Sequence, residues 1–186
     1  STITGSGTIT ITNNKTITTG SNLTVGPVIN INPATLVTNQ GTITHLNNLT
    51  GVNSASSVWG NAANAVLNTT GDVLTTGTLL ASSSPNTVNY NGSGAQIVKG
   101  TTYNNLFISN AGIKTAGAAV TVNNNLLVQD NAQFAPGQNV TISAGGVLTI
   151  QDNAIFNQST NTLTGTNADL VMTDNSEYRI GRTANG

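Results

Sequence analysis

QDNAIF, at residues 151–156, is the middle copy of a repeat that decides the fold. The chain reads QDNAQF at 129–134 and TDNSEY at 173–178, so the motif recurs at a fixed step of 22 residues. The same step brings five sets of like residues into columns: Leu126, Leu148 and Leu170; Val128, Ile150 and Met172; Asp130, Asp152 and Asp174; Asn131, Asn153 and Asn175; Phe134, Phe156 and Tyr178. Such columns predict a stacked structural repeat.

The repeat extends toward the N-terminus with a slightly shorter step. NNLFISNA at 104–111 aligns with NNLLVQDN at 124–131, and VTV at 120–122 aligns with VTI at 140–142, both at a step of 20 residues. The columns therefore keep their register while the turns between them gain or lose two residues.

Short alternating runs occupy much of the rest of the chain. Apolar and polar residues alternate with period two, which predicts strands at 8–12, 16–18, 28–32, 42–44, 87–90, 120–122, 140–142 and 148–150. Clusters of Gly, Asn, Ser and Pro between these runs are typical of turns. Helix signals are nearly absent.

A unit of 20–22 residues cannot bury its apolar face alone, but it can do so against like units above and below it. We therefore predict an all-β fold, a right-handed parallel β-helix (β-solenoid) of about nine coils and about 40 Å in length. The alternative, an antiparallel sandwich, gives no reason for like residues to recur in columns. We expect a single domain over 1–186. The register is weakest at 51–70, where we expect a bulged coil or a short helix, with Trp59 as a packing residue.

The composition excludes several classes of partner. Only 6% of residues are charged, and Asn (29) and Thr (32) dominate. Five scattered basic residues are too few for nucleic acid or an anionic membrane surface, and no apolar run approaches the roughly 20 residues that span a bilayer. Without cysteine there is no disulfide and no thiolate site. The chain begins at Ser1 without a recognisable signal peptide, so we expect a processed product or a fragment.

Several segments carry a family resemblance. They are SVWGNAANAVLN (57–68), NTVNYNGSGAQIV (86–98), YNNLFIS (103–109), GIKT (112–115) and VTVNNNLLV (120–128). They resemble the coil repeats of large β-solenoid cell-surface and extracellular proteins, adhesin- or filament-like, of Bacteroidota-type bacteria. The resemblance implies a secreted, extracellular or cell-surface protein with an adhesin, filament or matrix role. It implies no catalytic residues, so none is carried over.

Residues suited to catalysis are few. His45 is the one histidine and has no acidic residue near it in the sequence, so we interpret it as structural. A G-x-S-x-G nucleophile elbow does not occur. We therefore expect no enzyme and no catalytic, cofactor-binding or metal residues.

Two of the columns have alternative interpretations. Stacked carboxylates at Asp130, Asp152 and Asp174 could bind a cation such as Ca²⁺. The favoured interpretation is that each Asp opens a turn, with its carboxylate accepting main-chain N–H bonds and facing water. The Phe134, Phe156 and Tyr178 column could form a carbohydrate platform, but an aromatic ladder inside the core is favoured, with Tyr178 where the column reaches solvent.

Pairs of the form Thr-x-Thr raise the possibility of an ice-binding plane: Thr2/Thr4, Thr8/Thr10, Thr16/Thr18 and Thr42/Thr44. A plane needs such pairs in one column of successive coils, and their irregular spacing favours ordinary outward strand positions instead. The glycosylation sequons at Asn22, Asn48 and Asn139 are expected by chance in this composition.

We predict a non-enzymatic, extracellular structural protein, a β-solenoid subunit of a bacterial surface filament or matrix fibre. Neither STITGSGTITIT (1–12) nor SEYRIGRTANG (176–186) resembles a solenoid cap, so end-to-end or strand-mediated contacts with copies of the same chain are expected. The alternative is a ligand-binding segment of a large surface adhesin, with surface glycans as the partner. An ice- or glycan-binding module is a further, weaker alternative.

Overall fold

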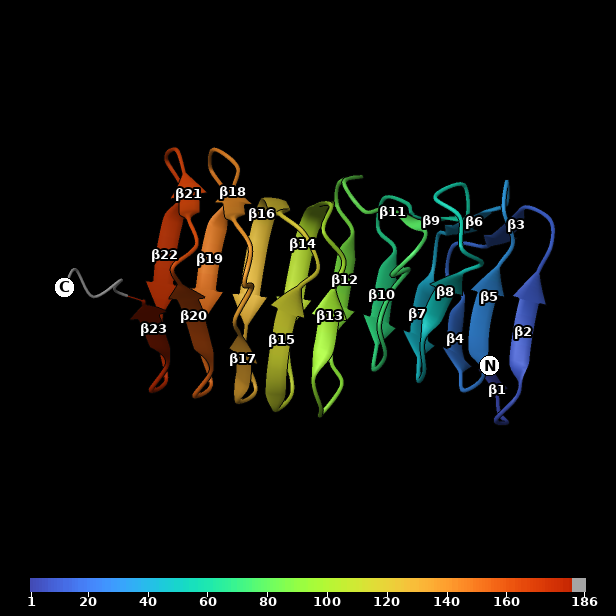
Figure 1. The fold of residues 1–186 in the computed structure, drawn as a ribbon, viewed down its shortest axis with the longest axis horizontal. Helices are drawn as coiled ribbons and strands as arrows, with labels where there is room; N and C mark the ends of the chain where they lie inside the picture. Colours follow the sequence, from blue (N-terminus) through green and yellow to red (C-terminus); the bar gives the residue numbers. More distant parts are fainter. Residues whose placement is uncertain (182–186) are drawn as a thin grey trace.

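The computed structural model describes residues 1–181, which form 23 strands and no helix. All strand pairs are parallel, and the strands stack into a β-solenoid of nine coils whose first and last strands lie at opposite ends of the long axis (Figure 1). The predicted fold class is confirmed. Each of the eight predicted strand segments overlaps an observed strand.

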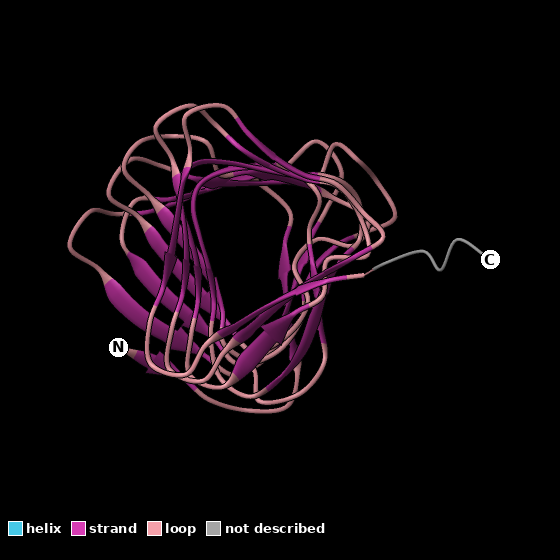
Figure 2. Ribbon diagram, turned by 90° about the vertical axis from the view of Figure 1, so that its left-hand side faces the viewer, coloured by secondary structure: helices cyan, strands magenta, loops and turns pink. Residues whose placement is uncertain are grey.

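Three walls of strands enclose the core, and we call them faces 1, 2 and 3 in the order in which the chain visits them (Figure 2). Face 1 consists of β1 (Thr2–Ile3), β4 (Asn22–Val25), β7 (Thr42–His45), β10 (Val66–Thr69), β12 (Thr87–Tyr90), the second halves of β14 (Thr102–Ile108) and β16 (Val120–Val128), β19 (Val147–Ile150) and β22 (Asp169–Met172).

Face 2 consists of β2 (Thr8–Ile11), β5 (Val28–Ile31), β8 (Leu49–Gly51), β13 (Gln96–Val98), β15 (Gly112–Ala116), β17 (Ala132–Phe134), β20 (Ile155–Ser159) and β23 (Glu177–Ile180). Face 3 consists of β3 (Lys15–Ile17), β6 (Leu36–Asn39), β9 (Val58–Asn61), β11 (Thr78–Leu80), the first halves of β14 and β16, β18 (Val140–Ile142) and β21 (Leu163–Gly165).

The register confirms the repeat. Leu126 pairs with Leu148 and Leu148 with Leu170, while Val128, Ile150 and Met172 form the neighbouring column. Successive steps along face 1 are 22, 20, 24, 21, 18, 20, 22 and 22 residues, following Thr2, Thr24, Thr44, Asn68, Asn89, Phe107, Leu127, Thr149 and Val171. The turns absorb this variation, so the strands stay aligned.

Polar side chains inside the stack bond along its axis. At the corner between faces 3 and 1, Asn39 Nδ2 donates to Asn61 Oδ1 at 2.7 Å, and Asn86 Nδ2 donates to the carbonyl of Asn61 at 2.8 Å. All three side chains are buried. The side-chain N–H groups of all three amides therefore find partners in the protein rather than in water, whereas the buried Oδ1 of Asn86 has no partner among residues 1–181.

The segment at 51–70 is more regular than its sequence indicates. β9 pairs with β6 and β11, β10 pairs with β7 and β12, and the residues between Gly51 and Val58 form an enlarged loop at the corner. The short helix considered for this segment is therefore wrong. Trp59 is buried between Val37 and Leu79, as expected of a packing residue.

The fourth coil interrupts face 2. Among the described residues, Val73 makes a single bridge to Leu49, and β13 pairs only with β15. The Asp72 carboxylate replaces the missing ladder bond, because its Oδ1 accepts the Ile97 N–H at 2.7 Å.

Candidate interaction surfaces of the solenoid

The first coil leaves the apolar core open. Within residues 1–181, each of β1, β2 and β3 is paired on one side only. The inward side chain of Ile3 is 42% exposed, and Ile9, Ile11 and Ile17 are only partly buried. These residues line an apolar hollow of about 140 Å³ whose walls reach Trp59.

The last coil is open in the same way. β21, β22 and β23 are each paired on one side only within the described part of the chain. In the leucine column, exposure rises from 0% at Leu126 and 2% at Leu148 to 51% at Leu170. Leu163, Leu170 and Ala168 border a hollow of about 190 Å³ that continues to Ile142. Both ends therefore present unpaired main-chain groups beside exposed core side chains.

The two ends differ in charge. Lys15 is the only Lys, Arg, Asp or Glu among the first 71 residues, and it lines the N-terminal hollow. Among the described residues, the last coil carries three acids and one base, Asp169, Asp174, Glu177 and Arg179, a net charge of −2, and Arg182 lies outside the described residues. Arg179 and Glu177 form a bidentate ion pair at 2.7 Å, and this hydrogen bonding lowers the pKa of Glu177.

The aromatic column lies inside the core, as favoured from the sequence. Phe134 and Phe156 are fully buried with ring centroids 5.7 Å apart, and Tyr178 continues the stack at 5.6 Å with partial exposure. A carbohydrate platform on all three rings is thereby excluded. The Tyr178 hydroxyl bonds to Gln158.

Lys114 precedes Phe134 in this column, which the sequence analysis missed. Its ammonium is buried and donates to the carbonyls of Gly92, Asn110 and Ala111 at 2.7–2.8 Å. Burial lowers the pKa of Lys114 to about 8. Because all three ammonium donors are used inside the fold, Lys114 has a structural role.

His45 also points inward, stacked between Val25 and Thr69 on face 1. Its Nε2 lies 2.9 Å from the carbonyl of Pro27, so Nε2 carries the proton and donates. Its buried Nδ1 has no hydrogen-bond partner among residues 1–181. Burial lowers the pKa of His45. This arrangement fits a core residue and is unsuited to a catalytic base, which needs an accessible proton to take.

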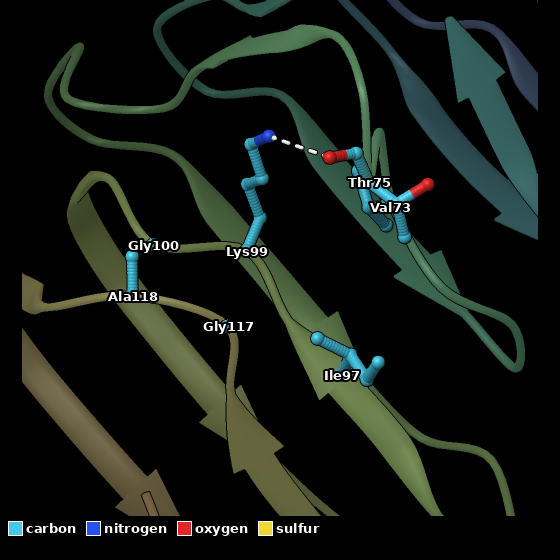
Figure 3. Close-up of a pocket in the computed structure, with 7 residues that line it drawn as sticks. All are labelled: Val73, Thr75, Ile97, Lys99, Gly100, Gly117 and Ala118. Carbon is cyan, nitrogen blue, oxygen red and sulfur yellow. Dashed lines mark hydrogen bonds between the residues drawn. The ribbon is translucent and has the colours of Figure 1, made fainter. Parts of the chain in front are cut away.

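The break in face 2 creates a hollow of about 230 Å³ on the outer surface, lined by Val73, Thr75, Ile97 and Lys99 and closed by Gly100, Gly117 and Ala118 (Figure 3). The Lys99 ammonium reaches across it to the Thr75 carbonyl at 3.5 Å. Burial lowers the pKa of Lys99. The hollow therefore combines apolar walls with one cation.

A closed ring of hydrogen bonds holds the main chain behind this hollow. The Lys99 N–H donates to Tyr90 Oη at 3.0 Å, and Tyr103 Oη donates to the Lys99 carbonyl at 2.6 Å. Tyr90 must then donate to Tyr103 Oη, 3.2 Å away, because the Tyr103 proton is already used. Burial raises the pKa of Tyr90 to about 12. Both hydroxyl protons and the Lys99 N–H donate within the ring, so none of them is free to bind a ligand. The role of the ring is therefore to fix the wall of the hollow.

The Asp-Asn motifs are turns. Asp130 and Asn131 have φ of 57° and 60°, and Ala132 N–H donates to Gln129 O at 3.1 Å, as in a type I′ turn. Asn131 N–H donates to the main-chain carbonyl of Asp152 in the next coil at 2.9 Å. The expected bonding of the carboxylates is wrong in detail, since no main-chain N–H of residues 1–181 donates to the Asp130, Asp152 or Asp174 carboxylate. In that same range no group of three or more acids or histidines is placed to hold a metal ion.

The Thr-x-Thr pairs are spread over three faces. Thr8/Thr10 lie on face 2 and Thr16 lies on face 3. Thr2 and Thr44 lie in one column of face 1, with Thr24 between them, but Asn68 ends this column in the next coil. A Thr column that was not predicted lies on face 3 at Thr102, Thr121, Thr141 and Thr164. This column has one Thr hydroxyl per coil rather than the pair per coil that an ice-binding plane needs. The sequon side chains of Asn48 and Asn139 accept main-chain N–H groups from the next coil.

Comparison with known proteins adds no family to this geometry. No family model, no curated protein and no solved structure matches the chain. The described residues contain no helix long and apolar enough to cross a membrane.

Proposed function

We propose that this chain is a structural segment of a bacterial surface filament or matrix fibre, which acts outside the cell and without catalysis. The observation that carries the proposal is the open core at both ends. Unpaired strand edges recruit further strands, and stacked repeats require a polar cap where they are to stop. Within residues 1–181, the inward side chains of Ile3 and Leu170 are 42% and 51% exposed at the two end coils.

The preferred partner is a second copy of the chain, joined head to tail. A contact between unlike ends does not close on itself, so it propagates into a filament. The lysine at the N-terminal mouth and the net negative C-terminal coil favour this pairing over contacts between like ends. The coil repeats that resemble extracellular β-solenoids support a surface location.

Two blocked variants test the proposal. Ile3→Lys blocks the N-terminal end, and Leu170→Lys blocks the C-terminal end. Matched controls are Thr2→Lys and Val171→Lys, which place the same charge on the outward side of the same strands. Sedimentation and negative-stain electron microscopy measure assembly, and far-UV circular dichroism checks that each variant remains folded.

We expect the natural chain and both controls to form filaments and each blocked variant alone to stay monomeric. A mixture of the two blocked variants should give a dimer and nothing larger, because it offers one free end of each kind. A natural chain that stays monomeric at high concentration overturns the proposal. A dimer of Ile3→Lys with itself indicates contacts between like ends.

A second candidate function, a ligand-binding adhesin segment, is favoured by the hollow at Lys99. Its apolar walls, single cation and rigid support suit a small ligand that carries an anionic group, such as an acidic sugar of a surface glycan. A glycan array with the natural chain tests this function. Lys99→Met should abolish any acidic-glycan signal, and Lys15→Met, remote from the hollow, should preserve it.

A further inference from the structure

The edge of a solenoid is a ramp rather than a flat ring. Each coil advances by one strand spacing, about 4.8 Å, over three faces, so each face begins about a third of a spacing above the one before it. At the N-terminal end the ramp runs through β1, β2 and β3. At the C-terminal end it runs through β21, β22 and β23, which lie on faces 3, 1 and 2. The two ramps therefore start on different faces.

We propose that a second copy docks with its first coil turned by one face, so that β1 pairs with β21, β2 with β22 and β3 with β23. This inference rests on the proposed head-to-tail assembly and specifies its register. The turn makes the two ramps parallel, so all three strand pairs form at once. Without the turn, β1 pairs with β22 on face 1 and β2 pairs with β23 on face 2. On face 3, however, a gap as wide as one strand remains between β3 and β21, so that pair cannot form.

The side chains match in the turned arrangement. β22 and β2 both have four residues. Their inward residues are Leu170 and Met172 on one copy and Ile9 and Ile11 on the other. Pairing them continues two aliphatic columns across the junction and covers the exposed surface at each end.

Lys15 provides the second argument. It points inward, in the column of Val37 and Trp59, and an inward charge at a strand edge opposes pairing unless it finds a partner. In the turned arrangement, Lys15 faces the inward side chain of Tyr178 on β23. The chain already places a lysine next to this aromatic column once, since Lys114 pairs in register with Phe134, although main-chain carbonyls hold the Lys114 ammonium there. A cation over an aromatic face is a favourable pair.

The unturned arrangement gives Lys15 no such partner. Lys15 would lie in line with Leu163, which belongs to the same inward position on face 3. The ammonium would then enter an aliphatic column, and burying an unpaired charge is costly. The turned register therefore lets all three strand pairs form and gives the Lys15 ammonium a partner.

Single cysteines report the register, because the chain has none of its own. Thr10 points outward from β2, Val171 outward from β22 and Arg179 outward from β23. Neighbouring strands bring paired Cα atoms within the distance that a disulfide spans. We mix Thr10→Cys with Val171→Cys or with Arg179→Cys, oxidise gently and quantify heterodimers by non-reducing electrophoresis.

The turned register predicts at least tenfold more disulfide with Val171→Cys than with Arg179→Cys. The reverse ratio overturns the turned register and leaves head-to-tail assembly standing. Disulfides of Thr10→Cys with itself as the main product indicate like-end contacts and overturn both. Absence of cross-links, together with a monomeric mixture of Ile3→Lys and Leu170→Lys, also overturns both.

Discussion

His45 and Lys114 occupy inward positions among aliphatic and aromatic neighbours, and the fold satisfies them to different degrees. Lys114 has an acceptor for each of its three donors, all of them main-chain carbonyls. His45 has a partner for only one of its two nitrogens. A residue that is fully bonded should be costly to replace, whereas a residue with an unbonded nitrogen should respond to pH.

Acidification should destabilise the fold through His45. Burial lowers its pKa in the folded state below the ordinary value of 6.5, so the unfolded state takes up the proton first. This contribution to stability is complete above pH 6.5 and is lost as the pH falls below that value. The melting temperature of the natural chain should therefore drop between pH 7.5 and pH 5. His45→Gln, which keeps a donor for Pro27 but cannot gain charge, should show a smaller drop, and equal drops would contradict this role.

Replacing Lys114 should cost about 3 kcal/mol, because Lys114→Met leaves one buried and two partly buried carbonyl oxygens without their donor. Lys99→Met is the matched control. Lys99 makes one long contact at a partly exposed position, so its loss should change the free energy of unfolding by less than about 0.5 kcal/mol. Urea unfolding of both variants gives the comparison, and equal costs would mean that the carbonyl cluster around Lys114 does not require its ammonium.

At the scale of strands and turns, the sequence predicted which residues stack in columns better than it predicted which polar residues point into the core. The 22-residue step correctly placed Leu126, Leu148 and Leu170 in one column because a repeated turn fixes the register of the next strand. Extending the 20-residue step a few positions further would have placed Lys114 in the column of Phe134. A lone lysine in a strand normally points outward, and the carbonyls of Gly92, Asn110 and Ala111 make the inward position of Lys114 tolerable.

Two elements could not be predicted from periodicity. Coil 4 has no face 2 strand, and the Asp72 side chain accepts the Ile97 N–H in place of the missing ladder bond. This substitution depends on a tertiary contact across 25 residues and leaves no periodic signal. The hollow at Lys99 follows from this loss, and it was missed for the same reason.

A charge in an inward column should be much more costly than the same charge one residue away. Ile150 is buried beneath Val128, whereas Thr149 on the same strand points outward. Ile150→Asp should therefore lower the free energy of unfolding by more than about 3 kcal/mol, because no cation lies in that column to pair with it. Thr149→Asp should cost less than about 1 kcal/mol. Chemical unfolding measures both, and similar losses would mean that the two faces of β19 are assigned the wrong way round.

The whole molecule is quasi-one-dimensional, since each coil contacts mainly the coil before it and the coil after it. Stability in such a stack is a sum of coil and junction contributions, and an end coil has only one junction. The end coils should therefore open before the central ones. Assembly into a filament would give each end coil its second junction.

Leu126 and Leu170 belong to one column, and substitutions at these two residues distinguish a free end coil from one that is covered in a filament. In dilute solution Leu126→Ala should cost about 2–5 kcal/mol, because it leaves a cavity in a packed core. Leu170→Ala should cost less than about 1 kcal/mol there, since the side chain is already half exposed. At concentrations where filaments form, the side chain of Leu170 becomes buried at a junction, so the loss in melting temperature caused by Leu170→Ala should increase with protein concentration. The loss caused by Leu126→Ala should stay constant, because its environment does not change on assembly. A Leu170→Ala effect that is independent of concentration would mean that the C-terminal end stays uncovered, and the filament proposal would fail with it.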